Sequence, residues 1–468
     1  MSELKIRFDF NNLMSERLGD QGIPYPQVEQ SGLQAAQAAE WFYRQRAKGK
    51  MDFFDLPAKT GHLKSSLALA QRLKGRFTDL VVLGIGGSAL GTAAVQAALN
   101  PYAYNHQDKK ALKGKPRLWV MDNVDPEKLK SVQALLNPKT TLVNVISKSG
   151  ATAETSAQFL WLRQWLFKSL GPKWKNNLVV TTDPEDGILR QIVREEGLLS
   201  LEVPSGVGGR FSVLTPVGLF PLAMTGVDVK GLIAGAAAMR QRTLNENPWR
   251  NPARLYALMQ YLLYQRGFKI NVMMPYSDSL YLLADWFRQL WAESLGKRLN
   301  IRNEVVETGP TPVKAVGATD QHSQIQLYAE GPRDKVVTFI QVEKFRTPLS
   351  IPKGYSKLKD LAYLSGHDFG ELLNAEQRAT AMSLAKNGRP NCCFIIPQIN
   401  APALGQMIFL LETATAYAGG LFGVNPMDQP GVEEGKRYVY GLMGKDGFAN
   451  RAVEVEKFEK GSLGKYIV

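Results

Sequence analysis

Short apolar runs alternate with amphipathic stretches over most of this chain. Mostly apolar runs occur at residues 80–85, 117–122, 141–147 and 177–182, and each is followed by a helical or turn-rich stretch. A second alternation contains a long helix from about 278 to 296 and apolar runs at 268–275, 335–342 and 392–397. Apolar strands that are separated by helices indicate parallel sheets covered on both faces. The pattern therefore predicts an α/β protein with two successive α/β units.

The flanking segments differ from these two units. Residues 1–75 contain the amphipathic run QAAQAAEWFYRQRAKG, which predicts an N-terminal helical extension without a clear strand. We expect the α/β units at 76–228 and 253–420, with a junction at 229–252 that ends in the Asn- and Pro-rich sequence NENPWRNPAR. Residues 421–468 begin with a Gly- and Pro-rich turn and form a C-terminal segment that carries Lys436.

Charge narrows the choice of partner. The 468 residues include 57 Lys and Arg against 43 Asp and Glu, a net charge of +14 that favours anionic partners. The densest basic stretch, residues 109–117, lacks the interleaved aromatic residues of a single-strand binding platform, so a phosphorylated metabolite fits better than nucleic acid.

Residues 81–99 are uncharged and long enough to span a membrane, but they divide better into a strand, a glycine turn and a helix. Charges near the start argue against a signal peptide, so we expect a cytoplasmic protein without membrane contact.

A glycine-rich turn follows the first predicted strand. The backbone amides of Gly86, Gly87 and Ser88 precede a helix, which is a geometry that binds anions. Gly84, Gly86 and Ala89 also satisfy the G-x-G-x-x-G/A pattern of dinucleotide sites, but the acid expected about 20 residues further on is absent. Taken alone, this loop fits a phosphate site and a simple packing turn about equally well.

A second loop, SKSGATAET at 147–155, gathers hydroxyl groups at another helix start. They belong to Ser147, Ser149, Thr152 and Thr155. Capping a helix takes one such side chain, so this cluster favours a phosphate cradle made of hydroxyls and exposed amides. Capping alone, with Glu154 and Thr155 as first-turn residues, is the alternative.

The charged candidates are harder to interpret from spacing. Gln289 and Glu293 lie four apart on one face of the helix in DWFRQLWAESLGK, and spacing alone favours a surface ion pair of Glu293 with Lys297 over catalysis. The four histidines are too far apart for an HExxH-type signature, and the two cysteines are adjacent, so no metal site is predicted. An ordinary surface role is the default for three other residues: Arg210, His322 and Lys436.

Six ordered motifs together resemble one enzyme family. They are GIGGSALG at 84–91, SKSGATAET at 147–155, GGRFS at 208–212, ESLGK at 293–297, TDQHSQ at 319–324 and VNPMDQPGVEEGK at 424–436. They are similar to those of the glucose-6-phosphate isomerase family, in its bacterial form. The resemblance implies two sugar-isomerase (SIS) domains, each a flavodoxin-like three-layer αβα sandwich with a mainly parallel five-stranded sheet. It also implies a homodimer that works on a sugar phosphate without cofactor or metal.

The family's site residues can be carried over motif by motif. The resemblance implies that the phosphate loop consists of Ser147, Lys148, Ser149 and Thr152, and that Gly87 and Ser88 line the same cavity. It implies that Glu293 is the base, that Arg210 stabilises the enediolate, and that Gln289 and Gln429 hold the sugar. His322 of a neighbouring subunit and Lys436 would open the sugar ring. The implied reaction interconverts glucose 6-phosphate and fructose 6-phosphate in glycolysis and gluconeogenesis.

Three alternatives stay open on the sequence alone. Small residues at Gly150, Ala151 and Ala153 depart from the animal-type loop, and a dual-specificity phosphoglucose/phosphomannose isomerase fits as well. SIS domains also serve as non-catalytic sugar-phosphate sensors, although such a module would lose the acid–base set that is present here. A nicotinamide-dependent oxidoreductase rests on the glycine pattern alone.

Overall fold

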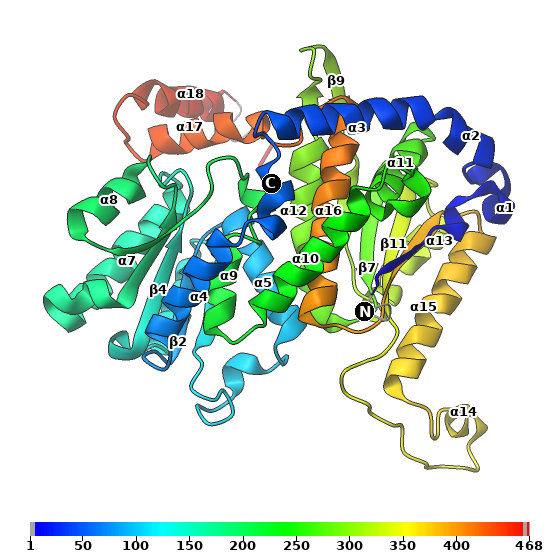
Figure 1. Ribbon diagram of the computed structural model, residues 1–468, viewed down its shortest axis with the longest axis horizontal. Coiled ribbons are helices and arrows are strands. Elements are labelled where there is room, and N and C mark those ends of the chain that lie inside the picture. Colours follow the sequence, from blue (N-terminus) through cyan, green and yellow to red (C-terminus); the bar gives the residue numbers. More distant parts are fainter. Residues whose placement is uncertain (1–4, 462–465, 468) are drawn as a thin grey trace.

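The first α/β unit is built on a five-stranded parallel sheet in the computed structural model, which describes residues 5–461 and 466–467 (Figure 1). Across this sheet the order is β3-β2-β4-β5-β6, a flavodoxin-like order. The strands are β2 (Asp79–Leu83), β3 (Arg117–Met121), β4 (Thr141–Ile146), β5 (Leu178–Thr182) and β6 (Leu199–Glu202). The four predicted strands are confirmed. The fifth, β6, was not predicted, because its sequence LSLE is short and only partly buried at the edge.

Helices cover both faces of this sheet, which explains why β2, β4 and β5 are buried along their whole length. One face packs against α6 (Pro126–Ala134), α7 (Ala153–Leu170) and α8 (Ile188–Glu196). The other face packs against α4 (Gly61–Leu73) and α9 (Pro216–Met224). The sheet and its helices therefore form the expected three-layer sandwich.

The second sheet has the order β1-β12-β11-β7-β10. Its strands are β1 (Arg7–Asp9), β7 (Ile270–Pro275), β10 (Thr311–Lys314), β11 (Lys335–Val342) and β12 (Asn391–Ile396). All neighbours are parallel except β1, which runs antiparallel to β12. The three predicted strands are confirmed, but the N-terminal extension is not purely helical, because β1 closes one edge of this sheet. Three residues are too few for a periodic pattern, so β1 was missed.

A shared layer of helices lies between the two sheets (Figure 1). At its centre is α16 (Ala401–Phe422), which is buried on all sides and packs against α3 (Gly32–Ala47), α10 (Val229–Thr243), α11 (Pro252–Gln265) and α12 (Tyr281–Leu295). The contact of α10 with α16 is close, since a Cβ on Gly235 would lie 1.9 Å from the Pro402 carbonyl oxygen. Further helices here are α5 (Leu90–Leu99), beside α12, and α9.

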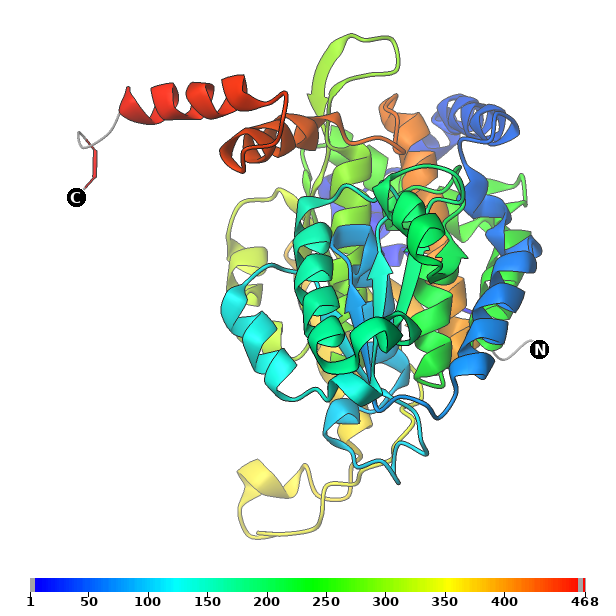
Figure 2. The same cartoon turned by 90° about the vertical axis from the view of Figure 1, so that its left-hand side faces the viewer.

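Several smaller elements complete the fold. The N-terminal α1 (Ser15–Leu18) and α2 (Tyr25–Gln30) follow β1, and α13 (Ile325–Glu330), α14 (Lys359–Ala362) and α15 (Phe369–Lys386) belong to the second unit. The hairpin of β8 (Lys297–Leu299) and β9 (Val305–Thr308) follows α12. Figure 2 shows α17 (Glu433–Leu442) and α18 (Ala449–Lys460) extending away from the body at one end, and the segment around α14 protruding at another. Over residues 5–461, no helix has the length and apolar character needed to cross a membrane.

Candidate active site

The glycine turn after β2 is crowded by two other parts of the chain. Gly86 has a φ of +58°, and a Cβ there would lie 2.6 Å from Nε2 of Gln289 on α12. A Cβ on Gly87 would lie 2.2 Å from the backbone carbon of Gly209. A side chain is therefore disfavoured at these two glycines, because α12 and the loop before Arg210 approach them so closely. The turn thus has a packing role, and it also brings the amides around Ser88 to the edge of the site.

The Ser- and Thr-rich loop joins β4 to α7 at the neighbouring position of the same sheet edge. The Ser147 hydroxyl accepts a bond from the Gly150 amide at 3.1 Å and lies 3.2 Å from the Thr152 hydroxyl. Thr152 is the residue before the first turn of α7, yet its side chain makes no capping hydrogen bond. The exposed Ser149 and the Thr152 hydroxyl are thus not required for capping, which favours the phosphate interpretation.

Lys148 is oriented away from this cradle. Its ammonium group donates to the backbone carbonyls of Ser205 and Val207, the latter at 3.0 Å. Burial lowers the pKa of Lys148, and the Asp183 and Asp52 carboxylates oppose that shift. The side chain therefore holds the loop that leads to Arg210 against the phosphate loop.

Arg210 is the centre of the buried polar cluster. It lies in the 3₁₀ turn η9 (Gly209–Phe211), its residue surface is 4% exposed, and its Nε donates to the Ser294 hydroxyl at 2.8 Å. Its Nη1 lies 2.9 Å from Oε1 of Gln429 and 3.3 Å from Oε2 of Glu293. Its Nη2 donates to the carbonyls of Asp428, at 3.0 Å, and Pro426. Burial lowers the pKa of this guanidinium, and the Glu293 carboxylate opposes the change.

Glu293 lies in the last turn of α12 and receives contacts from two predicted partners. Besides Arg210, Nε2 of Gln289 donates to its Oε1 at 3.1 Å. The Glu293 side chain is 33% exposed, so it is accessible to a ligand. Oε1 of Gln289 is buried without a hydrogen-bond donor among the described residues, which leaves an acceptor for a bound hydroxyl group.

Residues 65–445 match the family model described as phosphoglucose isomerase, which is more than half of the chain. The chain belongs to the phosphoglucose isomerase family. A glucose-6-phosphate isomerase from Carboxydothermus hydrogenoformans is 44% identical over 464 residues, 98% of each chain. The crystal structure of a hypothetical protein from Thermus thermophilus is 34% identical, with a TM-score of 0.83 over 94% of this chain and 100% of that one. A glucose-6-phosphate isomerase structure from Chlamydia trachomatis, at 20% identity, covers 96% of this chain and 95% of that one; its TM-score of 0.76 shows the same fold.

In this member of the phosphoglucose isomerase family, the surface ion pair that the spacing of Glu293 and Lys297 favours is not formed. Lys297 is not a surface partner of the Glu293 carboxylate: its side chain is 4% exposed, and it donates to the backbone carbonyls of Glu293 and, at 3.0 Å, of Asp428. Burial and the nearby Arg210 charge lower the pKa of Lys297 to about 8. The ESLGK motif contains this lysine, but only the fold shows that it holds the turn at 424–429 to α12.

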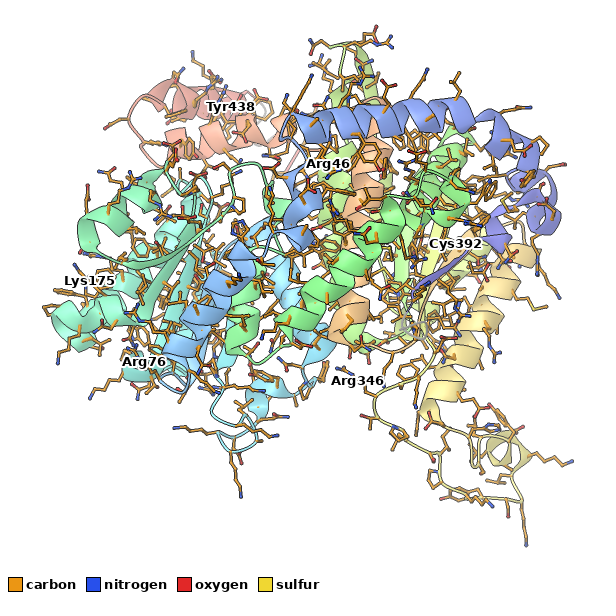
Figure 3. All side chains as sticks on the ribbon, in the orientation of Figure 1. Arg46, Arg76, Lys175, Arg346, Cys392 and Tyr438 are labelled. Carbon is orange, nitrogen blue, oxygen red and sulfur yellow. The ribbon has the colours of Figure 1, made fainter. Side chains whose placement is uncertain are left out.

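Two predicted site residues, Lys436 and His322, lie outside the buried cluster around Arg210. Lys436, on α17 near the labelled Tyr438 (Figure 3), is exposed and pairs with Glu433 at 2.7 Å. From the same helix the Tyr440 hydroxyl lies 3.5 Å from the Ala151 carbonyl oxygen, so α17 lies over the phosphate loop.

His322 is exposed and follows directly after the 3₁₀ turn η12 (Thr319–Gln321). Gln321 of this turn bonds to Tyr276 and to Thr380 of α15. His322 therefore belongs to the second unit, away from the first sheet's loops.

No metal centre can be recognised in this site. Among the described residues, no three His, Cys, Asp or Glu side chains are grouped as metal ligands. The groups that converge are a carboxylate, a guanidinium, two amides and a hydroxyl-lined loop. Such a set can bind a phosphate, orient hydroxyl groups and transfer a proton.

Proposed function

We propose that this site interconverts glucose 6-phosphate and fructose 6-phosphate, the isomerisation for which the family is named and a step of glycolysis and gluconeogenesis. The observation that carries the assignment is the contact between Glu293 and the buried Arg210 at 3.3 Å, beside a hydroxyl-rich loop at the sheet edge. In this proposal the phosphate binds at Ser147, Ser149 and Thr152. Anchoring that inert end uses binding energy to orient the carbons that react.

The proton transfer needs one group that acts first as base and then as acid on one face of the sugar. Glu293 removes the proton from C2 of the open-chain aldose, and the electrons form a cis-enediolate as negative charge develops on the C1 oxygen. Transfer of the proton of the C2 hydroxyl to the C1 oxygen, and return of the proton from Glu293 to C1, give the ketose with its carbonyl at C2. Arg210 supplies fixed positive charge near the developing oxyanion, and Gln289 and Gln429 hold the sugar.

Ring opening requires a second set of proton donors and acceptors, for which we propose His322 and Lys436. His322 would come from the second subunit of a homodimer. Two regions protrude from the body of the protein, around α18 and around α14 (Figure 2). Both carry exposed apolar side chains, which support such a dimer. Phe458 on α18 is 82% exposed, and Tyr355 and Tyr363 near α14 are 76% and 68% exposed. For its location we propose the cytoplasm, supported by the free thiols of Cys392 and Cys393.

The role of Glu293 is tested by Glu293→Gln, which keeps the shape and removes the base. We expect kcat for fructose 6-phosphate to fall by about 10²–10⁴, the usual contribution of a general base, while far-UV circular dichroism stays unchanged. The matched control is Glu330→Gln, on the exposed end of α13, which should keep wild-type turnover. Glu293→Gln with wild-type turnover would disprove the assignment.

The shared site is tested by mixing two inactive variants. If His322 acts across the interface, a hybrid of Glu293→Gln and His322→Gln subunits has one site with both changes and one intact site. Subunit exchange of an equal mixture should then recover about a quarter of wild-type activity. If His322 acts within its own chain, the hybrid contains no intact site and the mixture stays inactive.

A further inference from the structure

A second cavity lies at the outer edge of the second sheet, away from the loops that form the active site. Its volume is about 420 Å³, within the usual range for small-molecule pockets. One wall is the N-terminal segment from β1 to α1, the opposite wall is α15, and β12 contributes the floor. Figure 3 labels Cys392 on β12, close to β1 and α15, and Cys393 lines the same cavity.

A buried amide faces this cavity. Gln377 is 3% exposed, lines the cavity, and has no side-chain hydrogen bond to any described residue. It shares one face of α15 with Ala381 and Ala385, which line the cavity as well. The polar atoms of the Gln377 amide are not among the fully buried atoms without a partner, so the amide reaches the interior of the cavity. Its donors and its acceptor are therefore available to a polar group that enters the cavity.

Charge indicates what kind of ligand this is. Arg17, Arg378 and Lys386 line the cavity, and within residues 5–461 none of the three forms an ion pair. The carboxylate that lines it, Asp9, accepts two hydrogen bonds from Asn11, at 3.0 and 2.7 Å. The opening of the cavity thus carries more positive than negative charge, and the side-chain amide of Asn391 lies at its floor on β12.

The amide groups of the floor are held in place. The Asn391 amide donates to the Ala381 carbonyl at 3.0 Å, and its oxygen accepts from Asn12 at 3.1 Å. These bonds join β12 to α15 and to the N-terminal segment, so the walls have a fixed separation. A ligand in between would contact all three elements at once.

We propose that this cavity is a second binding site, for a small metabolite with a phosphate or carboxylate group. The anionic group lies among Arg17, Arg378 and Lys386, and the polar remainder of the ligand bonds to Gln377. Occupation holds the N-terminal segment against α15, and the chemistry at Glu293 does not require it.

Hydrogen exchange tests the site directly, with inorganic phosphate and malonate as separate probes. We expect either anion to slow amide exchange in residues 9–17 and 377–386 several-fold in the wild-type protein. Protection by phosphate alone identifies a phosphate ester as the ligand class, and protection by malonate alone identifies a carboxylate.

Two variants and a control localise the effect. Arg378→Gln and Gln377→Leu should lose at least tenfold in affinity for the protecting anion, and Arg378→Gln should keep wild-type kcat/KM. Arg72→Gln, on the exposed face of α4, should respond as wild type. The proposal is overturned if neither anion protects these segments, or if Arg378→Gln is protected as strongly as wild type.

Discussion

Replacement of Arg210 by lysine keeps a positive charge in the site but removes the planar set of N–H groups. Arg210 donates to five acceptors: the Ser294 hydroxyl, the Gln429 amide, the Glu293 carboxylate and the carbonyls of Pro426 and Asp428. A lysine has three N–H groups on a single nitrogen. It can reach at most three of these five acceptors, and since the Asp428 carbonyl keeps its bond from Lys297, at least one of the others is left without a donor.

The expected magnitudes follow from this loss. A buried acceptor that loses its donor costs about 1–3 kcal/mol, so Arg210→Lys should lower the free energy of unfolding by at least about 1–3 kcal/mol. Removing a fixed donor that is aimed at developing charge lowers kcat by about 10²–10³. Urea unfolding measures the first quantity. A coupled assay of glucose 6-phosphate formation, run at low temperature on folded protein, measures the second.

Ser294→Ala is the matched control, because it removes only the partner of the Arg210 Nε. We expect it to cost about 1 kcal/mol of stability and to leave kcat within about threefold of wild type. If Arg210→Lys retains wild-type kcat, Arg210 does not stabilise the enediolate. If Ser294→Ala loses as much kcat as Arg210→Lys, the orientation of Arg210 matters more than its donors, and the reasoning above is wrong.

Two further predictions concern Lys297 and the phosphate loop. The pKa of Lys297 in the fold is about 8, below the value near 10.4 in an unfolded chain, so between these values the unfolded chain binds a proton that the folded chain has lost. The free energy of unfolding therefore rises with pH in this range. Between about pH 7.5 and 9.5, urea unfolding should show the wild-type protein gaining about 2 kcal/mol of stability relative to Lys297→Met. If both proteins have the same pH dependence, the prediction is wrong. At Gly150, where φ is +67°, a Cβ would lie 2.7 Å from the Leu189 amide nitrogen, so Gly150→Ala should raise KM about tenfold or more. Gly171→Ala, at φ +54° with no atom within 4 Å of the new Cβ, is the control and should leave KM unchanged.

The fold was predictable where one strand alone carries enough apolar residues. The seven predicted strands are those with mostly apolar sequences, and some of them, such as β4 and β5, are buried along their whole length. The missed strands depend on their neighbours: β1 exists because β12 offers an open edge, and β10 because β7 does. Short strands of this kind carry little information in their own sequence, since the partner strand supplies the hydrogen bonds.

The candidate site also contains parts that the local sequence predicts and parts that depend on residues distant in the sequence. The loops at 86–88 and 147–152 were found because glycines and hydroxyls at a strand end have a local physical meaning. The surface interpretation of Lys297 was wrong because the spacing to Glu293 describes one helix and contains nothing about the turn at Asp428, which buries the lysine. A local rule fails where the decisive acceptor is distant in sequence.

That distant acceptor also shows how the site is held together. The Asp428 carbonyl accepts hydrogen bonds from both Arg210 and Lys297, at 3.0 Å each, so two cations from different loops share one oxygen. Both are buried, and the Arg210 charge adds to the effect of burial in lowering the pKa of Lys297. Because all five Arg210 donors are already in use, a substrate oxygen that binds Arg210 must replace one of these acceptors, and the longest of the five bonds is the one to Glu293, at 3.3 Å. Exchange with Glu293 would release the carboxylate when the substrate arrives, which is when a base is needed.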